Sequence, residues 1–258
     1  MLTGCQQLLT LHGPAPKRGR ALAEPGIVRD AAVLVRDGRI AAVGRRRNVS
    51  RLAEARRAKK LDLGGGVVLP GFVDSHTHLI FPASRAGEYE KRIAGATYEE
   101  IARAGGGILC TVRKLRSASR AELKQRALAS LRQMAAHGTT TLEAKSGYGL
   151  DLASELKTLV LLLELQREQP LEIVPTFLGA HVVPKEYRKR PEAYVQLLVS
   201  QMIPAVAAEG LAEFCDVYCD RGAFTVEQAR RILTAGRVCG LVPRLHAEQI
   251  ARTGAAQL

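Results

Sequence analysis

From Leu69 onward, short apolar segments alternate with long amphipathic patterns, and this alternation restricts the fold more than any other feature of the sequence. Such alternation is the signature of βαβ units, in which helices join parallel strands. We therefore expect an α/β fold with a parallel sheet of five strands. The strand segments are VVLPGFVDSHTHL, TTTLEAKSGYG (139–149), LEIVPTFLGAH (171–181), AEFCDVYCD (212–220) and LVPRLHAEQ (241–249).

The segments between these strands carry helix start and stop signals. Ser119 is a capping residue for a helix that is predicted to stop at Gly138. Asp151 begins a second helix, and Thr225 caps a third that is predicted to end at Gly236.

The length of this region leaves two architectures open. A (β/α)₈ barrel typically needs about 250 residues, whereas about 190 residues follow Leu69. After the last predicted strand only IARTGAAQL follows, which is too short to close a barrel. The region is either an open, doubly wound five-stranded sheet or a chain that stops part-way through a barrel.

The segment before Leu69 has a different pattern. In AAVLVRDGRIAAVG, the dipeptide Asp37-Gly38 separates two alternating apolar runs. This is a strong signal for a β-hairpin with a two-residue turn.

Four of the six histidines lie where a predicted strand ends. His76 and His78 are two residues apart, so both can project from the same face of one strand. His181 and His246 follow at the ends of two further strands. Converging imidazoles are typical ligands of a divalent metal ion, and barrel enzymes build their active sites at this edge. The alternative is a set of hydrogen-bonded core histidines, which have no reason to prefer one edge.

Several longer motifs carry a family resemblance. LPGFVDSHTHL is similar to the first barrel strand of the amidohydrolase superfamily. Four other segments resemble the imidazolonepropionase family more narrowly, and the resemblance runs from about Val33 to the last residue. They are AGATYEEIARAGGGI (94–108), EAKSGYGLDLASELK (143–157), TFLGAHVVPKEY (176–187) and LHAEQI (245–250).

The resemblance implies a metal-dependent-hydrolase (β/α)₈ TIM-type barrel with only about five βα units present. Residues 69–258 would form this incomplete barrel, and residues 1–68 the N-terminal part of a small β domain of the sandwich type. It also implies one zinc (Zn²⁺) or iron (Fe³⁺) ion per chain, with an aspartate of the eighth strand as the fourth protein ligand. The implied histidine ligands are His76, His78 and His246.

The implied reaction is hydrolysis of the cyclic amide C–N bond of 4-imidazolone-5-propanoate, which gives N-formimidoyl-L-glutamate in histidine degradation. Arg85 can bind the propionate carboxylate through two parallel hydrogen bonds. Tyr148, His181 and Gln249 offer partners for the polar ring atoms. The expected proton-transferring group and the aspartate ligand would lie beyond Leu258, so we expect a C-terminally truncated form with little or no activity.

Two other functions remain open from the sequence. The first is a related aminohydrolase acting on a nucleobase-like ring, which would have little use for Arg85. The second is a metal-free binding or regulatory protein built on a partial barrel. Lys145 could have either of two roles. Some amidohydrolases use a carboxylated lysine to bridge two metals, but the resembled family uses one metal, so a lysine that supports the structure or the metal ligands is favoured.

Composition and charge argue against nucleic acid and membranes as partners. The net charge is +13 and arginines crowd into residues 44–60, but aromatic residues make up only 4% and no nucleic-acid motif is present. A solvated basic surface is therefore favoured over nucleic-acid binding. No signal peptide or apolar run long enough to span a membrane is seen.

The cysteines indicate a reducing compartment. Five cysteines, an odd number spread along the chain, do not suggest a disulfide framework, so a cytoplasmic protein is expected. Cys215 and Cys219 share one strand face and are predicted to be buried thiols. A homodimer that hides exposed strand edges is possible, and the expected ligand is a small anionic substrate.

Overall fold

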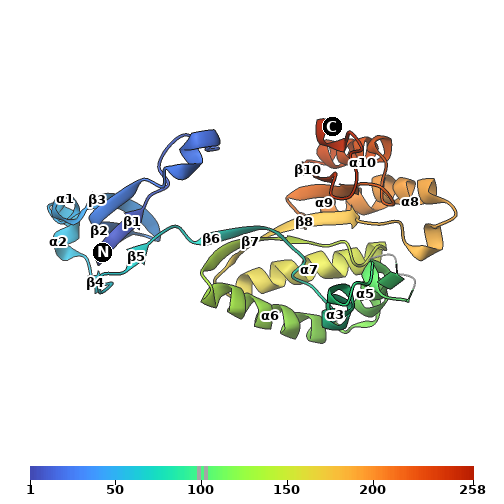
Figure 1. Cartoon of the computed structure of the whole chain (residues 1–258), viewed down its shortest axis with the longest axis horizontal. Helices are drawn as coiled ribbons and strands as arrows, with labels where there is room; N and C mark the ends of the chain where they lie inside the picture. The colour runs from blue at the N-terminus through green and yellow to red at the C-terminus, as the bar shows by residue number, and fades with distance from the viewer. Residues whose placement is uncertain (98–99, 102–103) are drawn as a thin grey trace. The chain divides into compact units, whose positions relative to one another are not determined.

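The computed structural model describes residues 1–97, 100–101 and 104–258. These residues form two compact units, Met1–Gly71 and Phe72–Leu258 (Figure 1). Four positions of the motif AGATYEEIARAGGGI, 98–99 and 102–103, lie outside the described residues.

The first unit is built on one five-stranded sheet with the order β3-β2-β1-β4, in which β5 also pairs with β1. Strands β2 and β3 are antiparallel and are joined by Asp37 and Gly38, whose φ angles are 51° and 72°. Two central residues with positive φ define a type I′ turn, so the predicted hairpin is confirmed. The strands are β1 (Leu2–Leu9), β2 (Ile27–Arg36), β3 (Arg39–Arg45), β4 (Leu61–Asp62) and β5 (Val67–Val68).

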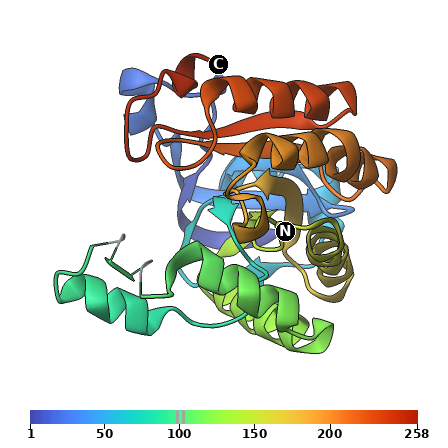
Figure 2. The ribbon, with the colours of Figure 1, turned by 90° about the vertical axis from the view of Figure 1, so that its right-hand side faces the viewer.

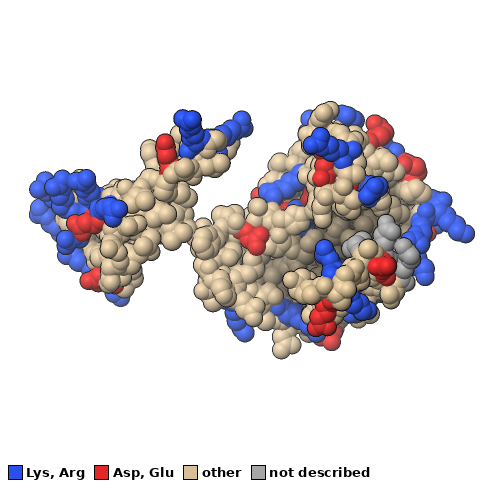
Figure 3. All heavy atoms as spheres, viewed as in Figure 1, with Lys and Arg blue, Asp and Glu red and all other residues tan. Residues whose placement is uncertain are grey.

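Two short helices, α1 (Arg46–Val49) and α2 (Ala53–Arg57), pack on this sheet through Val49 and Ala55. A 3₁₀ turn, η1 (Gly19–Ala23), completes the unit. The arginines of residues 44–60 are exposed to solvent, and Figure 3 shows blue atoms gathered over this part of the unit. This agrees with a solvated basic surface.

The second unit contains a five-stranded parallel sheet with the order β10-β9-β8-β7-β6. The five predicted strands are confirmed. Their bounds are β6 (Phe72–Thr77), β7 (Thr139–Lys145), β8 (Glu172–Ala180), β9 (Phe214–Cys219) and β10 (Val242–Ala247).

One strand boundary differs from the prediction. The segment VVLPGFVDSHTHL was expected to be a single strand, but Val67–Val68 pairs in the first sheet as β5, and β6 begins at Phe72. Pro70 lies in the gap between them and has no backbone N–H to donate to a sheet. The one apolar run therefore serves two different sheets.

Helices cover the outer face of the second sheet (Figure 2). Helix α6 packs against β7, α7 against β8, and α10 against β9 and β10, around one apolar core. Among the described residues, no helix combines the length and apolar character that crossing a bilayer requires. The helices are α3 (Ala86–Ile93), α5 (Gly107–Ser117), α6 (Arg120–Ala136), α7 (Leu152–Glu168), α8 (Pro191–Leu197), α9 (Ile203–Ala208) and α10 (Val226–Val238), with a π-helical turn η3 (Leu198–Met202) and 3₁₀ turns η2 (Lys185–Tyr187) and η4 (Ala255–Gln257).

The predicted helix starts are confirmed. Ser119 and Thr225 each form a capping box, and the Asp151 side chain accepts the N–H of Ser154. Gly138, with φ of 90°, follows the last residue and cap of α6. The predicted end of α10 at Gly236 is wrong, because the helix continues to Val238.

Gly236 is a packing residue inside α10. A Cβ at this position would lie 2.8 Å from Cβ and 3.0 Å from Sγ of Cys215 on β9. The glycine thus allows the helix to approach the sheet closely, which a pattern of helix-ending residues does not reveal.

We expect Gly236→Ala to destabilise the protein by about 1–3 kcal/mol through overpacking, although alanine favours a helix by about 1 kcal/mol over glycine. Urea unfolding measures this change. Gly87→Ala in α3 is the control, because a Cβ there meets open space. A Gly236→Ala variant as stable as the parent would contradict the packing role.

The strands of the second sheet have two chemically distinct faces. Cys215, Val217 and Cys219 of β9 are fully buried in the core against the helices. The prediction of two buried thiols is confirmed, and burial raises the pKa of the Cys215 thiol to about 12. Asp216 and Tyr218 alternate with them and therefore face the other side, where the candidate site lies.

Candidate metal and substrate site

The parallel strands bring their carboxyl ends, and the residues that follow, to one edge of the sheet. His76 lies in β6 and His78 just after it, His181 follows β8, and His246 lies in β10. Tyr148 lies in the loop after β7. The alternation of strands and helices in the sequence is the reason that residues from four strands meet here.

The sheet is strongly curled. Strands β6 and β10 are at opposite ends of the strand order, and in a flat sheet they would be about 19 Å apart. The ring centroids of His76 and His246 are nevertheless only 5.1 Å apart. The sheet is therefore a partial barrel and not an open, flat one, and this settles the choice left open by the sequence.

The His76 ring lies close to the rings of the other two predicted metal ligands, His78 and His246. The His76 ring centroid is 5.9 Å from that of His78 and 5.1 Å from that of His246. Two imidazoles bound to one ion with metal–nitrogen distances of about 2.0–2.1 Å have centroids about 5 Å apart. The Nδ1 atom of His78 is buried and has no hydrogen-bond partner within the described part of the chain.

The rings of the three predicted ligands are not oriented to bind one metal ion in this structure. Over residues 1–97, 100–101 and 104–258, no three His, Cys, Asp or Glu side chains are positioned to hold a metal ion. His246 Nε2 instead lies 2.7 Å from Oε1 of Gln249. The donor types and spacings thus fit a metal, while ring rotation is needed to aim the nitrogens at one point.

Burial and nearby charges favour the neutral form of His76, His78 and His181. Burial, reinforced by His181 and His76, holds the pKa of His78 well below its usual value. Loss of solvent and the nearby Lys145 ammonium lower the pKa of His76. Burial lowers the pKa of His181 to about 4. Neutral imidazole is the form that binds metals and accepts hydrogen bonds.

His181 and Tyr148 form an aromatic cluster with His78. The rings of His78 and His181 are stacked, with centroids 5.0 Å apart, and the Tyr148 ring lies 4.6 Å from His78 and 5.2 Å from His181. His181 Nδ1 lies 2.9 Å from the carbonyl oxygen of Gly147. Because a carbonyl only accepts, Nδ1 holds the proton and Nε2 is left as an acceptor.

Two further aromatic residues were missed by sequence reasoning. Phe81 packs against Tyr148 at 5.6 Å, and Tyr218 lies 4.8 Å from His246 and 6.2 Å from His181. Tyr218 alternates with the buried residues of β9, so strict period-2 reading of that strand would have pointed it at the histidines.

Arg85, predicted to bind the substrate carboxylate, is paired with a carboxylate of its own helix. It lies at the N-cap of α3, and its Nε donates to Oε2 of Glu88 at 2.8 Å. The other oxygen of Glu88 accepts the N–H of Gly107 at the start of α5. The Arg85 side chain is about 30% exposed, and its guanidinium is already paired with a carboxylate.

Gln249 lies on the loop after β10, and Asp220 fixes the backbone of that loop. The buried Asp220 carboxylate accepts the N–H groups of Ile250 and Ala251 at 2.7 and 3.1 Å. These hydrogen bonds keep the pKa of Asp220 below its usual value despite its burial. Glu248, with φ of 58°, accepts the N–H of Gly254, so it supports the loop as well.

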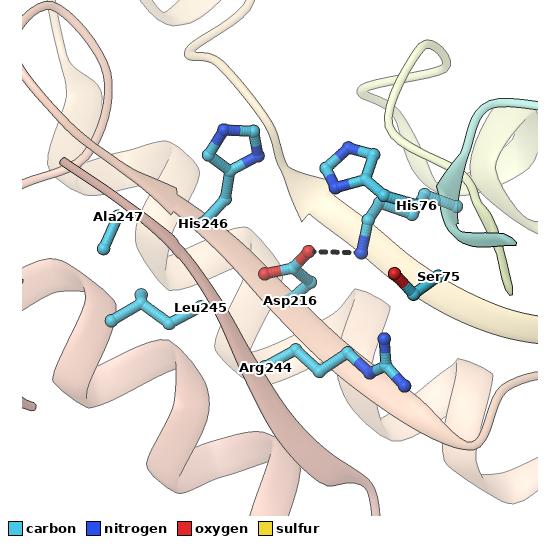
Figure 4. A pocket seen from close by; sticks show the side chains of 8 residues that line it. Ser75, His76, Asp216, Arg244, Leu245, His246 and Ala247 are labelled. Atoms are coloured by element: carbon cyan, nitrogen blue, oxygen red, sulfur yellow. Dashed lines mark hydrogen bonds and ion pairs between the residues drawn. The ribbon is translucent and has the colours of Figure 1, made fainter. Parts of the chain in front are cut away.

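A cavity of about 460 Å³ opens between His76 and His246 (Figure 4). Asp216 lies between the two imidazoles in this view, and its carboxylate accepts from Nζ of Lys145 at 2.7 Å. The Lys145 ammonium also bonds Glu143 at 2.6 Å, and all three side chains are nearly fully buried. Lys145 is therefore an ion-paired structural lysine, as favoured from the sequence, while Glu143 and Asp216 were not anticipated.

Solved structures with this architecture show the class of fold. An atrazine chlorohydrolase from Arthrobacter aurescens, complexed with zinc and atraton, has a TM-score of 0.60 and 14% identity over 96% of this chain and 53% of its own. A 5-methylcytosine deaminase from Klebsiella pneumoniae also gives 0.60, with 15% identity over 99% of this chain and 55% of its own. The chain thus shares the fold of about half of each of these enzymes, and the curled sheet of its second unit is a partial parallel α/β barrel.

Sequence relatives are more specific. Imidazolonepropionases from Symbiobacterium thermophilum and Myxococcus xanthus are each 49% identical over the whole chain, and one from Geobacillus kaustophilus is 46% identical over 98% of it. No family model matches the chain. The chain is a homologue of the imidazolonepropionases, which confirms the resemblance, and it spans about 61% of the length of these relatives.

Proposed function

We propose that this chain carries the metal and substrate site of an imidazolonepropionase, which hydrolyses 4-imidazolone-5-propanoate to N-formimidoyl-L-glutamate. The observation that carries the proposal is the cluster of His76, His78 and His246 with His181 and Tyr148 at the mouth of a curled parallel sheet. Identity of 41–49% to imidazolonepropionases supports the particular reaction.

The metal would be held by His76, His78 and His246. Imidazole ligands suit both zinc and iron, so one Zn²⁺ or Fe³⁺ ion per chain is proposed. A bound ion would supply Lewis-acid chemistry for the attack of water on the ring carbonyl. The proposal also requires a fourth ligand, an aspartate, and a group that transfers the proton, and neither role is assigned to a residue named above.

The substrate ring would lie against His181 and Tyr148. With its proton on Nδ1, His181 presents Nε2 as an acceptor for a ring N–H of the imidazolone. Tyr148 and Phe81 form an aromatic wall beside it. Gln249 can bond a second polar ring atom once it leaves His246.

Arg85 would bind the propionate group of the substrate. Its pairing with Glu88 keeps the guanidinium in place, and its partial exposure leaves room for a second carboxylate. Two parallel N–H donors match a carboxylate in geometry as well as in charge.

The proposal also covers the domain assignment, the cellular compartment and the assembly of the protein. Residues 69–258 are assigned to an incomplete (β/α)₈ barrel, and residues 1–68 to part of a small β domain of the sandwich type. The five free cysteines support a cytoplasmic protein. A homodimer that covers strand edges is the assembly proposed from the exposed apolar residues of β6, Phe72 and Val73.

We expect Arg85→Met to weaken binding of imidazolone propionate by roughly 10- to 100-fold, the loss of hydrogen bonds to a charged group. Titration calorimetry of the metal-loaded chain measures this change. Arg92→Met, on the exposed face of the same helix, is the matched control. Equal affinity in the Arg85→Met variant would point to a neutral ring substrate, as in a nucleobase aminohydrolase.

A further inference from the structure

The loop between β7 and α7 is organised around one buried carboxylate. Glu155, in the first turn of α7, accepts the N–H groups of Gly149 and Leu150 on Oε1, both at 2.8 Å. The N–H of Gly147 lies 3.0 Å from Oε2 and 3.2 Å from Oε1. The Ser146 side chain is a further hydrogen-bonding partner. One carboxylate therefore bonds almost every residue of the loop around Tyr148.

The carboxylate is fully buried, with 0% of the residue exposed. Burying a carboxylate is costly unless hydrogen bonds satisfy it, so its position here demands an explanation. An apolar side chain at this position could also pack under the first turn of α7, but it could not accept hydrogen bonds from the loop. The backbone hydrogen bonds indicate that the carboxylate determines the loop conformation.

Two residues of the loop, Gly147 and Leu150, have positive φ angles, which most residues adopt only at a cost in free energy. Leu150 has φ of 55°, a left-handed conformation that is unfavourable for a branched apolar residue. Gly147 has φ of 101°, and a Cβ there would lie 2.7 Å from the carbonyl oxygen of Leu178 and 3.1 Å from Nδ1 of His181. Such strain persists where surrounding bonds hold it and is frequent at functional sites.

The same loop residue controls the imidazole of His181. Gly147 donates its N–H to Glu155, and its carbonyl accepts from Nδ1 of His181 at 2.9 Å. The next residue, Tyr148, packs its ring on His78 and His181. Displacement of Gly147 would remove the acceptor that keeps the His181 proton on Nδ1.

We propose that Glu155 is a positioning residue, which holds Gly147 and Tyr148 so that His181 presents an unprotonated Nε2 to the site. The proposal rests on the proposed function in one respect, the use of that nitrogen to accept a hydrogen bond from the substrate. Glu155 itself touches neither the substrate nor the metal.

The test is the substitution Glu155→Gln in the metal-free 258-residue chain. Glutamine has the same shape but only one acceptor oxygen, so it cannot bond all three backbone N–H groups. Long-range ¹H–¹⁵N spectra of the histidine side chains report which ring nitrogen of His181 is protonated. Hydrogen exchange reports how firmly the loop amides are held. Glu164→Gln, on the same helix and paired with Arg120 at the surface, is the matched control.

We expect the parent and Glu164→Gln to show His181 protonated on Nδ1. In Glu155→Gln the two ring ¹⁵N shifts should move towards each other as an Nε2-protonated population appears. Exchange of the Gly147, Gly149 and Leu150 amides should accelerate by about 10- to 100-fold, in line with the loss of hydrogen bonds to a charged group.

Two results would overturn the proposal. Faster amide exchange with an unchanged His181 tautomer would mean that Glu155 only stabilises the loop. An Nε2-protonated His181 in the parent would exclude the proposal even if the variant failed to fold. Neither readout uses substrate, so a parent with the expected tautomer that does not bind imidazolone propionate would disprove the proposed function alone.

Discussion

Replacing Lys145 with methionine is expected to destabilise the protein by about 3–5 kcal/mol, the typical result of breaking a buried ion pair by removing one partner. The substitution leaves Glu143 and Asp216 buried, with Oε1 and Oδ2 deprived of the ammonium that they share. Thr176 and the backbone N–H of Val217 still bond the two carboxylates but carry no charge, and the Arg244 guanidinium lies 3.7 Å from Oε1 of Glu143, too far for a hydrogen bond. Urea-induced unfolding, followed by circular dichroism, measures the loss.

The matched control is Lys124→Met. Lys124 pairs with Glu168 across α6 and α7 at 2.5 Å, but both side chains are substantially exposed. Exposed pairs contribute only about 0–1 kcal/mol, so the difference between the two variants isolates the effect of burial. A Lys145→Met variant destabilised no more than Lys124→Met would show that the cluster does not hold the sheet together.

Replacing His76 or His246 with alanine is expected to abolish stoichiometric metal binding. Loss of a hydrogen-bonding partner outside the ligand set commonly costs roughly 10- to 100-fold in metal affinity, and loss of one of three imidazole ligands should cost more. The measurement is metal content by mass spectrometry after dialysis against zinc or iron, together with the dissociation constant from titration.

His137→Ala is the control for these variants. His137 caps the end of α6, and its Nδ1 lies 2.7 Å from the carbonyl oxygen of Gln133, so its role is structural. We expect its metal content to equal that of the parent. A parent chain that binds no metal would instead favour the metal-free binding protein.

The hairpin, the five parallel strands and three of the helices could be predicted because their signals are local. Short apolar segments between long helical patterns identified the five parallel strands, and the residues Ser119, Asp151 and Thr225 identified the helix starts. The position of His76 and His78 at a strand end followed from the same pattern. Local signals failed at Gly236, where the need for a glycine comes from Cys215 on a neighbouring strand.

The curvature of the sheet and the support of the site could not be predicted in this way. The contact between the rings of His76 and His246 depends on five strands curling together, which no single segment encodes. Asp216 and Glu143 acquire their role only when Lys145 lies between them. Arg85 was singled out from the family resemblance, but its pairing with Glu88 depends on how α3 and α5 pack.

The expectation of little or no turnover by residues 1–258 stays a prediction. It concerns the aspartate ligand and the proton-transferring group, whereas metal and substrate binding is proposed for His76, His78, His246, His181 and Tyr148. Binding and turnover are therefore separate questions for this chain, and binding addresses the site directly.

The most direct test of the proposed site is calorimetric titration of the zinc-loaded chain with 4-imidazolone-5-propanoate and with 4-imidazolone that lacks the propionate. We predict binding of one substrate molecule per chain, with a preference of roughly tenfold or more for the carboxylate-bearing compound, because Arg85 contributes charged hydrogen bonds. Absence of binding to both compounds, or equal affinity for them, would contradict an imidazolonepropionase site.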